Sequence, residues 1–261
     1  MIKAERISFS YEKEKELIQD LSIEIEEGKI TTIIGPNGSG KSTLLSLLCG
    51  LNKVTSGEIY IDNVSITKFS YKQLSQKIST VHQQNSVPSD ITVEKLVSYG
   101  RIPHKKLFKG KAEEDNEIID WAIKNTGLEK LKTSNVMGLS GGERQRAFIA
   151  MALSQKPKIL FLDEPTTYLD MYHQIEILEL IKKLNHENNL TVVMILHDIN
   201  QAIKYSHNMV VMKSGNIIKS GESAKIITEE LIRAVYKVDG KINEYNKELR
   251  YFIPSKCINF E

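Results

Sequence analysis

Residues 35–42 read Gly-Pro-Asn-Gly-Ser-Gly-Lys-Ser, and this stretch decides the fold. It matches the pattern G-x-x-x-x-G-K-[ST], in which glycines let backbone N–H groups approach phosphate oxygens closely. The run before it, Ile30–Ile34, is β-branched and apolar, as expected for a buried strand. A helix that begins at about Ser42 would add the positive end of its dipole. The sequence therefore predicts a phosphate-binding loop between a strand and a helix.

The side chains of this loop predict its ligands. Lys41 is expected to reach the β and γ phosphates of a nucleotide, and the Ser42 hydroxyl is expected to ligate Mg²⁺. The alternative is a glycine turn before a helix with an exposed lysine, but the full motif between a strand and a helix favours the phosphate loop. We therefore predict ATP and Mg²⁺ as ligands. The predicted nucleotide contacts are Gly35, Pro36, Asn37, Gly38, Ser39, Gly40, Lys41, Ser42 and Thr43.

Two further apolar runs end in residues that suit phosphate chemistry. The run 159–162 leads into Asp163 and Glu164, and the run 191–196 leads into His197. Ligands of parallel sheets bind at the carboxyl ends of strands, so we expect these side chains near the phosphate loop. Asp163 is predicted to hold Mg²⁺, and Glu164 to orient and deprotonate the attacking water. His197 is predicted to contact the γ-phosphate, although a histidine at a strand end is often only structural.

Residues 139–143, Leu-Ser-Gly-Gly-Glu, separate this chain from most phosphate-loop proteins. Ser140 offers a hydroxyl, and Gly141 and Gly142 expose backbone N–H groups before a helix, which suits a second phosphate contact. A capping box formed by Ser140 and Glu143 is the alternative, and the two interpretations are compatible. With this segment the chain resembles the ATP-binding-cassette (ABC) family. Its signature implies that Ser140, Gly141 and Gly142 contact ATP bound to a second copy of the chain.

Other elements of this family follow in order, and their roles rest on the resemblance. Tyr11 lies where the family carries an aromatic that stacks on adenine, with a plain strand aromatic as the alternative. Gln83 resembles the glutamine that links the helical subdomain to Mg²⁺ and water, although Gln84 adjoins it. Asp170 resembles the aspartate that crosses the dimer interface, and most members carry a small residue in place of Tyr168. The predicted catalytic residues are Lys41, Gln83, Glu164 and His197, and the predicted metal ligands are Ser42, Gln83 and Asp163.

The alternation of strand and helix patterns predicts an α/β fold with an inserted helical part. Residues 2–9 and 17–25 alternate as antiparallel strands do, with Leu17 on the core side. Helical spacing predicts a helix whose apolar stripe holds Ile175, Leu178, Ile181 and Leu184, widened by Ile177 and Leu180. We expect one ABC ATPase domain. It comprises a phosphate-loop NTPase core with an antiparallel β subdomain (1–84 and 159–225), a helical subdomain with the signature helix (85–158) and a C-terminal extension (226–261).

The last part of the chain carries weaker patterns. Ser214 and Gly215 predict the turn of a hairpin between residues 209–213 and 216–219. Residues 226–238 are expected to be helical. We assign no function to residues 239–261.

Residues 90–104 narrow the resemblance within the family. They follow the pattern TV-x-x-LV-x-x-GR-x-P, similar to ATPase subunits of importers for iron(III)-siderophores, haem and cobalamin. The alternative is only an amphipathic helix that Thr92 caps and Gly100 ends. The resemblance implies a homodimer that hydrolyses ATP and grips two integral membrane permease subunits, while an extracytoplasmic solute-binding protein delivers the metal chelate. The lysines at 105, 106, 109 and 111 are expected to form a solvated loop, with anionic lipid contact as the alternative.

Composition excludes some classes of protein. The 35 basic and 33 acidic side chains are interspersed and leave a net charge of +2, which argues against nucleic acid as a partner. We see no apolar stretch of about 18 residues and no secretory signal. We therefore expect a cytoplasmic protein, peripheral on the inner face of the membrane through its permease. Two alternatives stay open: an importer ATPase for haem, cobalamin, zinc or manganese, and a non-transport ABC ATPase acting on nucleic acid or translation.

Overall fold

A computed structural model describes residues 1–11, 16–105, 112–245 and 249–258. Three lysines of the predicted basic loop, Lys106, Lys109 and Lys111, lie outside these residues. The chain forms two compact units. Residues 1–66 and 193–261 make the first unit, and residues 67–192 make the second. The predicted subdomain boundaries (1–84, 85–158, 159–225 and 226–261) stay a prediction, because they follow family subdomains rather than compact units.

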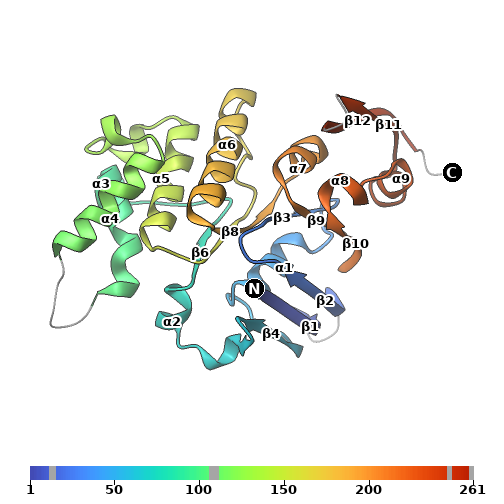
Figure 1. The fold of residues 1–261 in the computed structure, drawn as a ribbon, viewed down its shortest axis with the longest axis horizontal. Helices are drawn as coiled ribbons and strands as arrows, with labels where there is room; N and C mark the ends of the chain where they lie inside the picture. The colour runs from blue at the N-terminus through green and yellow to red at the C-terminus, as the bar shows by residue number, and fades with distance from the viewer. Residues whose placement is uncertain (12–15, 106–111, 246–248, 259–261) are drawn as a thin grey trace. The chain divides into compact units, whose positions relative to one another are not determined.

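The first unit contains the predicted antiparallel sheet (Figure 1). Its buried positions alternate along the first strand, where Ile2, Ala4 and Ile7 face the core. A one-sided core face of this kind is typical of antiparallel sheets. The strand order is β2-β1-β4-β5, with bounds β1 Ile2–Phe9, β2 Ile18–Ile25, β4 Ser56–Ile61 and β5 Val64–Ser65.

One detail of this sheet corrects the sequence prediction. Strand β2 begins at Ile18, which is fully buried, whereas Leu17 precedes it and is only half-buried. The cause is irregular pairing: Asp20 has a positive φ of 43°, and the register with β1 shifts between Ile7 and Phe9. A bulge of this kind changes which residues face the core, so simple alternation assigns Leu17 wrongly.

The first unit also carries the strand and helix on either side of the phosphate loop. All five residues of β3, Ile30–Ile34, are buried, and β3 pairs in parallel with β9, Asn208–Lys213. Helix α1, Lys41–Leu48, follows the loop. The predicted hairpin is confirmed, because β9 turns into β10, Asn216–Glu222, through Ser214 and Gly215. Both turn residues have positive φ (48° and 80°), as a two-residue hairpin turn with the right twist requires.

The end of the first unit is a small helical and β segment. Helix α9, Glu229–Tyr236, confirms the middle of the predicted helix at 226–238, but Val238 already begins a strand. The hairpin of β11 and β12 is joined to α7 by Asn200. The Asn200 Nδ2 donates to the carbonyl of Phe252 (3.1 Å), and its Oδ1 accepts from the Phe252 N–H (2.7 Å). The remaining bounds are α7 Ile199–Tyr205, α8 Ser223–Ile226, β11 Val238–Tyr245 and β12 Leu249–Cys257.

The second unit confirms the helical middle of the chain. Helices α3, α4 and α5 pack against one another and lie side by side (green in Figure 1). Two short strands, β6 and β7, pair in parallel, and every residue of β7 is buried. Strand β8, Thr191–Ile195, begins in this unit and ends in the first. The bounds are α2 Tyr71–Ser75, β6 Ile78–Val81, α3 Val93–Ser98, α4 Ala112–Asn125, α5 Gly141–Ser154, β7 Ile159–Leu162 and α6 Met171–Asn188.

Two features of the second unit differ from the predicted patterns. The predicted stripe of α6 is confirmed at Leu178, Ile181 and Leu184, which are buried together with Ile177, but Ile175 is 42% exposed. The alternative interpretation of residues 90–104 is right about Thr92, which caps α3, but the helical path does not end at Gly100 and continues as a 3₁₀ helix, η2, over Tyr99–His104. The other short 3₁₀ turns are η1 Ile66–Lys68, η3 Glu129–Leu131 and η4 Val136–Gly138. Within the described residues, no helix is both long enough and apolar enough to span a membrane.

Candidate functional site

The phosphate loop depends on glycine for two different reasons. Gly35 has a φ of 152°, and a Cβ there would lie 2.2 Å from the carbonyl oxygen of Met212 on β9. Gly38 has a φ of 76°, but a Cβ there would meet nothing within 4 Å. Gly35 is therefore required because the backbone of β9 packs closely against it, and Gly38 is required because its backbone has a positive φ. The space over Gly38 is open, as a phosphate cradle requires.

Lys41 lies within the curve of this loop. Its Nζ donates to the carbonyl oxygens of Gly35 (2.9 Å) and Pro36 (3.1 Å), and the side chain is buried. Gly40 is the N-cap of α1 and has no side chain to cap the first N–H groups of the helix. The Ser39 hydroxyl is buried without a hydrogen-bond partner among the described residues. A ligand rich in acceptor oxygens, such as a polyphosphate, fits this set of donors.

Two distant segments support the loop. The N–H of Gly215, in the turn between β9 and β10, donates to the carbonyl oxygen of Ser39 (3.0 Å). The Tyr236 hydroxyl is buried beside the backbone of Gly35, and this burial raises the pKa of Tyr236. Sequence reasoning missed both contacts. The Ser-Gly turn was a visible signal for a hairpin but not for its contact with the loop, and Tyr236 carried no signal.

Tyr11 and His197 also belong to the first unit. Tyr11 is 67% exposed, its ring packs edge-on against Phe9, and its hydroxyl lies 3.4 Å from Oγ1 of Thr43 in the first turn of α1. An exposed aromatic face beside this helix suits stacking on a base. His197 is exposed and follows Leu196, whose N–H donates to the carbonyl oxygen of Ile33 (3.4 Å). His197 is therefore near the end of β3, where the phosphate loop begins.

In the second unit, the structure brings Gln83 to Glu164. The Gln83 Nε2 donates to Glu164 Oε2 at 2.6 Å, and the Thr167 hydroxyl donates to the same oxygen at 3.0 Å. Asp163 lies at the start of the same turn, where its N–H donates to the carbonyl oxygen of Val81 (2.9 Å). Glu164 has a positive φ of 52°, and strained non-glycine residues cluster at functional sites. Gln83 makes this contact with the predicted base, and its functional role stays a prediction.

The signature segment forms the start of α5. The Ser140 hydroxyl accepts from the Glu143 N–H (3.3 Å), and the Glu143 carboxylate accepts from the Ser140 N–H and hydroxyl (2.8 Å each). These two donors hold the pKa of Glu143 below its usual value, and the predicted capping box is confirmed. Ser140 and Gly141 are exposed. Gly142 is buried, and a Cβ there would lie 2.7 Å from the ring of His173 on α6.

A shallow hollow of about 250 Å³ joins the signature to the glutamine segment. It is lined by residues from the segment after β6, from the start of α5 and from the turn after Glu164, including Gln83, Gly141, Arg144, Thr167 and Tyr168. All of them belong to the second unit. The hollow therefore places the predicted glutamine and signature on one continuous surface.

Asp170 has a clear local role. Its side chain caps α6 and accepts from the His173 N–H (3.0 Å). Tyr168, two residues earlier, has a φ of 64° and is 83% exposed, and glycine would adopt this backbone more readily. Met171 and Tyr172 are exposed beside it (77% and 71%), which suits contact with another protein. The predicted interface role of Asp170 stays a prediction.

Each unit thus carries its own share of the predicted residues. The first holds Tyr11, the loop from Gly35 to Thr43, and His197. The second holds Gln83, Ser140, Gly141, Gly142, Asp163, Glu164 and Asp170.

Comparisons with known proteins agree with this arrangement. A family model described as ABC transporter matches residues 18–167. The chain is 41% identical over 241 residues to the iron(3+)-hydroxamate import ATP-binding protein FhuC of Bacillus subtilis (strain 168), covering 92% of this chain and 89% of that protein. It is similar to a structure of a metal-chelate type ABC transporter in an inward-facing conformation (TM-score 0.84, 29% identity, 98% of this chain and 97% of that one). It is also similar to the dimeric structure of MJ0796, a bacterial ABC transporter cassette (TM-score 0.74, 32% identity, 87% and 100%).

Proposed function

Because the chain belongs to the ABC transporter family, we propose that it is the ATP-hydrolysing subunit of an importer for iron(III)-siderophores or related metal chelates. One observation carries the hydrolytic part. The chain combines an open phosphate cradle at 35–42 with a carboxylate, Glu164, that Gln83 and Thr167 hold in place. The resemblance to the iron-hydroxamate import protein supports the choice of cargo.

Hydrolysis of ATP follows from the roles of these side chains. The backbone N–H groups of residues 35–42 and the Lys41 ammonium bind the phosphates. Ser42, Asp163 and Gln83 would hold Mg²⁺, which when bound neutralises charge on the phosphate oxygens. Glu164 orients the attacking water and takes its proton, and a general base of this kind contributes about 10²–10⁴-fold to the rate. His197 contacts the γ-phosphate, and Tyr11 stacks on the adenine.

Two copies of the chain form the working enzyme. Ser140 and Gly141 are exposed at the N-terminal end of α5, where their polar groups suit the phosphates of a nucleotide held by a second copy. The similarity to a dimeric cassette supports this arrangement. Asp170 and the exposed side chains of Tyr168 and Met171 would lie near the second copy.

Import requires further partners. Two integral membrane permease subunits would bind the dimer at residues 90–104, and an extracytoplasmic solute-binding protein would deliver the chelate. The ATPase would then be peripheral on the inner face of the membrane. Haem, cobalamin, zinc and manganese importers share the same motor, so the cargo is set by the other subunits. Assignment to an iron-chelate importer is tested by the reading frames next to the one that encodes this chain. We expect them to encode a permease and a lipoprotein that binds an iron chelate.

The motor is tested by Glu164→Gln in the full-length chain. We expect ATP binding to persist, ATP to trap a dimer, and turnover to fall by at least about 100-fold. Glu187→Gln, an exposed change near the end of α6, is the matched control and should leave turnover unchanged. Undiminished hydrolysis in Glu164→Gln would remove Glu164 as the base.

The contact in trans is tested by Ser140→Ala. We expect slower hydrolysis and weaker ATP-driven dimerisation, with the affinity of the monomer for ATP unchanged. If monomer binding fell by the same factor, the signature would act on the nucleotide of its own chain.

A further inference from the structure

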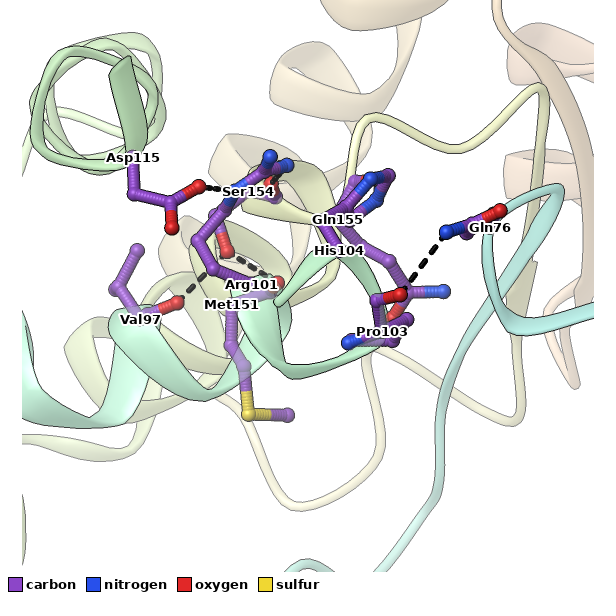
Figure 2. Close-up of polar contacts among 9 residues, drawn as sticks. All are labelled: Gln76, Val97, Arg101, Pro103, His104, Asp115, Met151, Ser154 and Gln155. Atoms are coloured by element: carbon purple, nitrogen blue, oxygen red, sulfur yellow. Dashed lines mark hydrogen bonds and ion pairs between the residues drawn. The ribbon is translucent and has the colours of Figure 1, made fainter. Parts of the chain in front are cut away.

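A buried cluster joins η2 to the C-terminal end of α5 (Figure 2). Arg101 is only 5% exposed; its Nε donates to Asp115 Oδ1 on α4 (2.8 Å), and its Nη1 donates to the carbonyl oxygen of Ser154 (2.7 Å). His104 Nε2 donates to the carbonyl oxygen of Gln155 (2.8 Å). Two side chains of η2 therefore bind the last carbonyl groups of the signature helix, where cationic and N–H donors are favoured.

The same contact leaves no gap between the two segments. A Cβ on Gly100 would lie 2.1 Å from both the carbonyl oxygen of Met151 and the hydroxyl of Ser154. Ser154 is fully buried, and its hydroxyl donates to the carbonyl oxygen of Val97 on α3 (2.7 Å). Gly100 is therefore explained by close packing of η2 on α5 rather than by a helix end.

The end of α5 is also held from a second side. The side-chain amide of Gln155 donates to the carbonyl oxygens of Ser75 and Ile78, at the end of α2 and the start of β6. The Gln76 Nε2 donates to the carbonyl oxygen of Pro103 (2.9 Å), as Figure 2 shows. The α5 terminus, η2 and α2 are thus tied together by polar contacts with fixed directions.

The chemistry of the cluster indicates that it fixes the position of η2 on α5 rather than raising the stability of the fold. A buried ion pair is often no more stabilising than apolar side chains of similar volume, because both charges lose their hydration. Its hydrogen bonds are directional, so Arg101 permits one arrangement of η2 on α5 where apolar packing would permit several. The polar cluster around Arg101 therefore suits a role in fixing the position of α5.

We propose that Arg101, assisted by His104, is a positioning residue for the signature Ser140–Gly142. Helix α5 has 14 residues and spans about 21 Å, with the signature at one end and the cluster at the other. The capping box satisfies the first N–H groups of the helix, and Arg101 and His104 bind its last carbonyl groups. A displacement of η2 therefore moves the signature with the helix. This inference rests on the proposed function, in which the signature contacts the nucleotide of a second copy.

The side of η2 that faces away from α5 is a surface for a partner protein. Ile102, next to Arg101, is 58% exposed, and Tyr99 is 38% exposed. The segment η2 therefore binds α5 with its polar side chains and exposes apolar side chains to the solvent. A permease subunit that binds residues 90–104, as proposed, would act on the signature through Arg101.

The test uses the full-length chain carrying Glu164→Gln, in which ATP should trap the dimer. Arg101→Lys keeps the charge but loses the forked donor group, and Gly100→Ala pushes η2 away from α5. For each we expect unchanged binding of a fluorescent ATP analogue to the dilute monomer and an ATP-dependent dimer dissociation constant raised about 3- to 30-fold in sedimentation. His104→Ala should weaken the dimer in the same direction, and His104→Gln, which restores an N–H donor, should recover part of the loss.

Lys132→Met is the matched control. Lys132 pairs with Asp120 (2.6 Å) and Glu94 (3.2 Å) in the same unit, and neither is a residue of the Arg101 cluster, so dimerisation should not change. Dimerisation at the parental level in folded Arg101→Lys and Gly100→Ala chains would overturn the proposal. An equal loss of monomer nucleotide binding would overturn it too, because the cluster would then be general support. If Glu164→Gln alone does not dimerise with ATP, the proposed function itself fails, and this inference fails with it.

Discussion

The side-chain amide of Gln83 donates a hydrogen bond of 2.6 Å to Oε2 of Glu164. The two residues lie 81 positions apart, just after the neighbouring parallel strands β6 and β7. The Thr167 hydroxyl donates to the same oxygen at 3.0 Å, so this oxygen is held from two directions. The proposed base is thereby oriented by a residue that follows β6 and by a residue of its own turn.

Gln83→Ala should slow hydrolysis without much change in ATP affinity. Loss of the amide removes a donor that orients Glu164, and removal of such supporting contacts costs about 10- to 100-fold in activity. We therefore expect kcat to fall in this range and KM to stay within about 2-fold. Steady-state ATPase assays measure both. Gln84→Ala is the control, and an equal fall in that variant would mean that the glutamine has been assigned to the wrong position.

Gly35→Ala should destabilise the chain and abolish ATP binding. The new Cβ would lie 2.2 Å from a backbone oxygen of β9, at a φ of 152° that side chains rarely adopt. We expect a loss of about 2–4 kcal/mol in the free energy of unfolding, measured with urea. Gly38→Ala is the comparison, because it adds backbone strain at φ 76° without a steric contact and should cost about 1–2 kcal/mol. Similar losses in both variants would contradict the packing explanation.

The phosphate loop and the signature were readable from the sequence because their chemistry demands particular residues in a row. Residues 35–42 need glycines for the cradle and a lysine for charge, and Ser140 with Glu143 forms a capping box over four positions. The all-apolar strands on either side were equally plain, since both of their faces are buried.

Long-range packing was not readable in the same way. In the alternative interpretation Gly100 ends a helix, whereas in the structure it lets η2 lie against α5, 51 or more residues away. Leu17 was misplaced by a bulge in β2, and Ile175 by the position of the buried stripe on α6. The support of the loop by Gly215 and Tyr236 depends on chain segments that only the tertiary fold brings together.

Tyr11→Ala should weaken ATP binding, whereas Tyr11→Phe should not. Base stacking on an aromatic ring contributes about 1–3 kcal/mol, and the low end applies to this exposed ring. We expect about a 5-fold rise in the dissociation constant for ATP in Tyr11→Ala. The phenyl ring of Tyr11→Phe keeps the stacking face and loses only the 3.4 Å contact of the hydroxyl with Thr43. Binding is measured by titration calorimetry, and equal effects of the two variants would point to the hydroxyl instead.

Asn200→Ala should loosen the C-terminal hairpin. It leaves the N–H and carbonyl of Phe252 without their side-chain partner, and lost hydrogen bonds to partly buried groups cost about 1–3 kcal/mol. Hydrogen exchange of residues 250–257 should accelerate by about 5- to 100-fold. Asn216→Ala is the control, because the Asn216 side chain donates to the carbonyl oxygen of Ser214 within its own turn, outside the C-terminal hairpin. Unchanged exchange in Asn200→Ala would show that the hairpin is held by other contacts.

The capping box predicts a pH-dependent contribution of Glu143 to stability. The Ser140 N–H and hydroxyl hold the pKa of Glu143 below its ordinary value of 4.5. The stabilising effect is therefore present above pH 4.5 and is lost as the pH falls through the lowered pKa of the folded chain. At pH 7 we expect Glu143→Gln, which keeps an acceptor oxygen but no charge, to lose about 0.5–1 kcal/mol in urea unfolding. The difference in unfolding free energy between the two proteins should narrow as the pH falls below 4.5.

In a Ser140→Ala background the effect of Glu143→Gln should be smaller, because the charge then has fewer donors to accept from. A difference in unfolding free energy that stays constant from pH 7 to pH values below 4.5 would show that the charge of Glu143 does not stabilise the helix start.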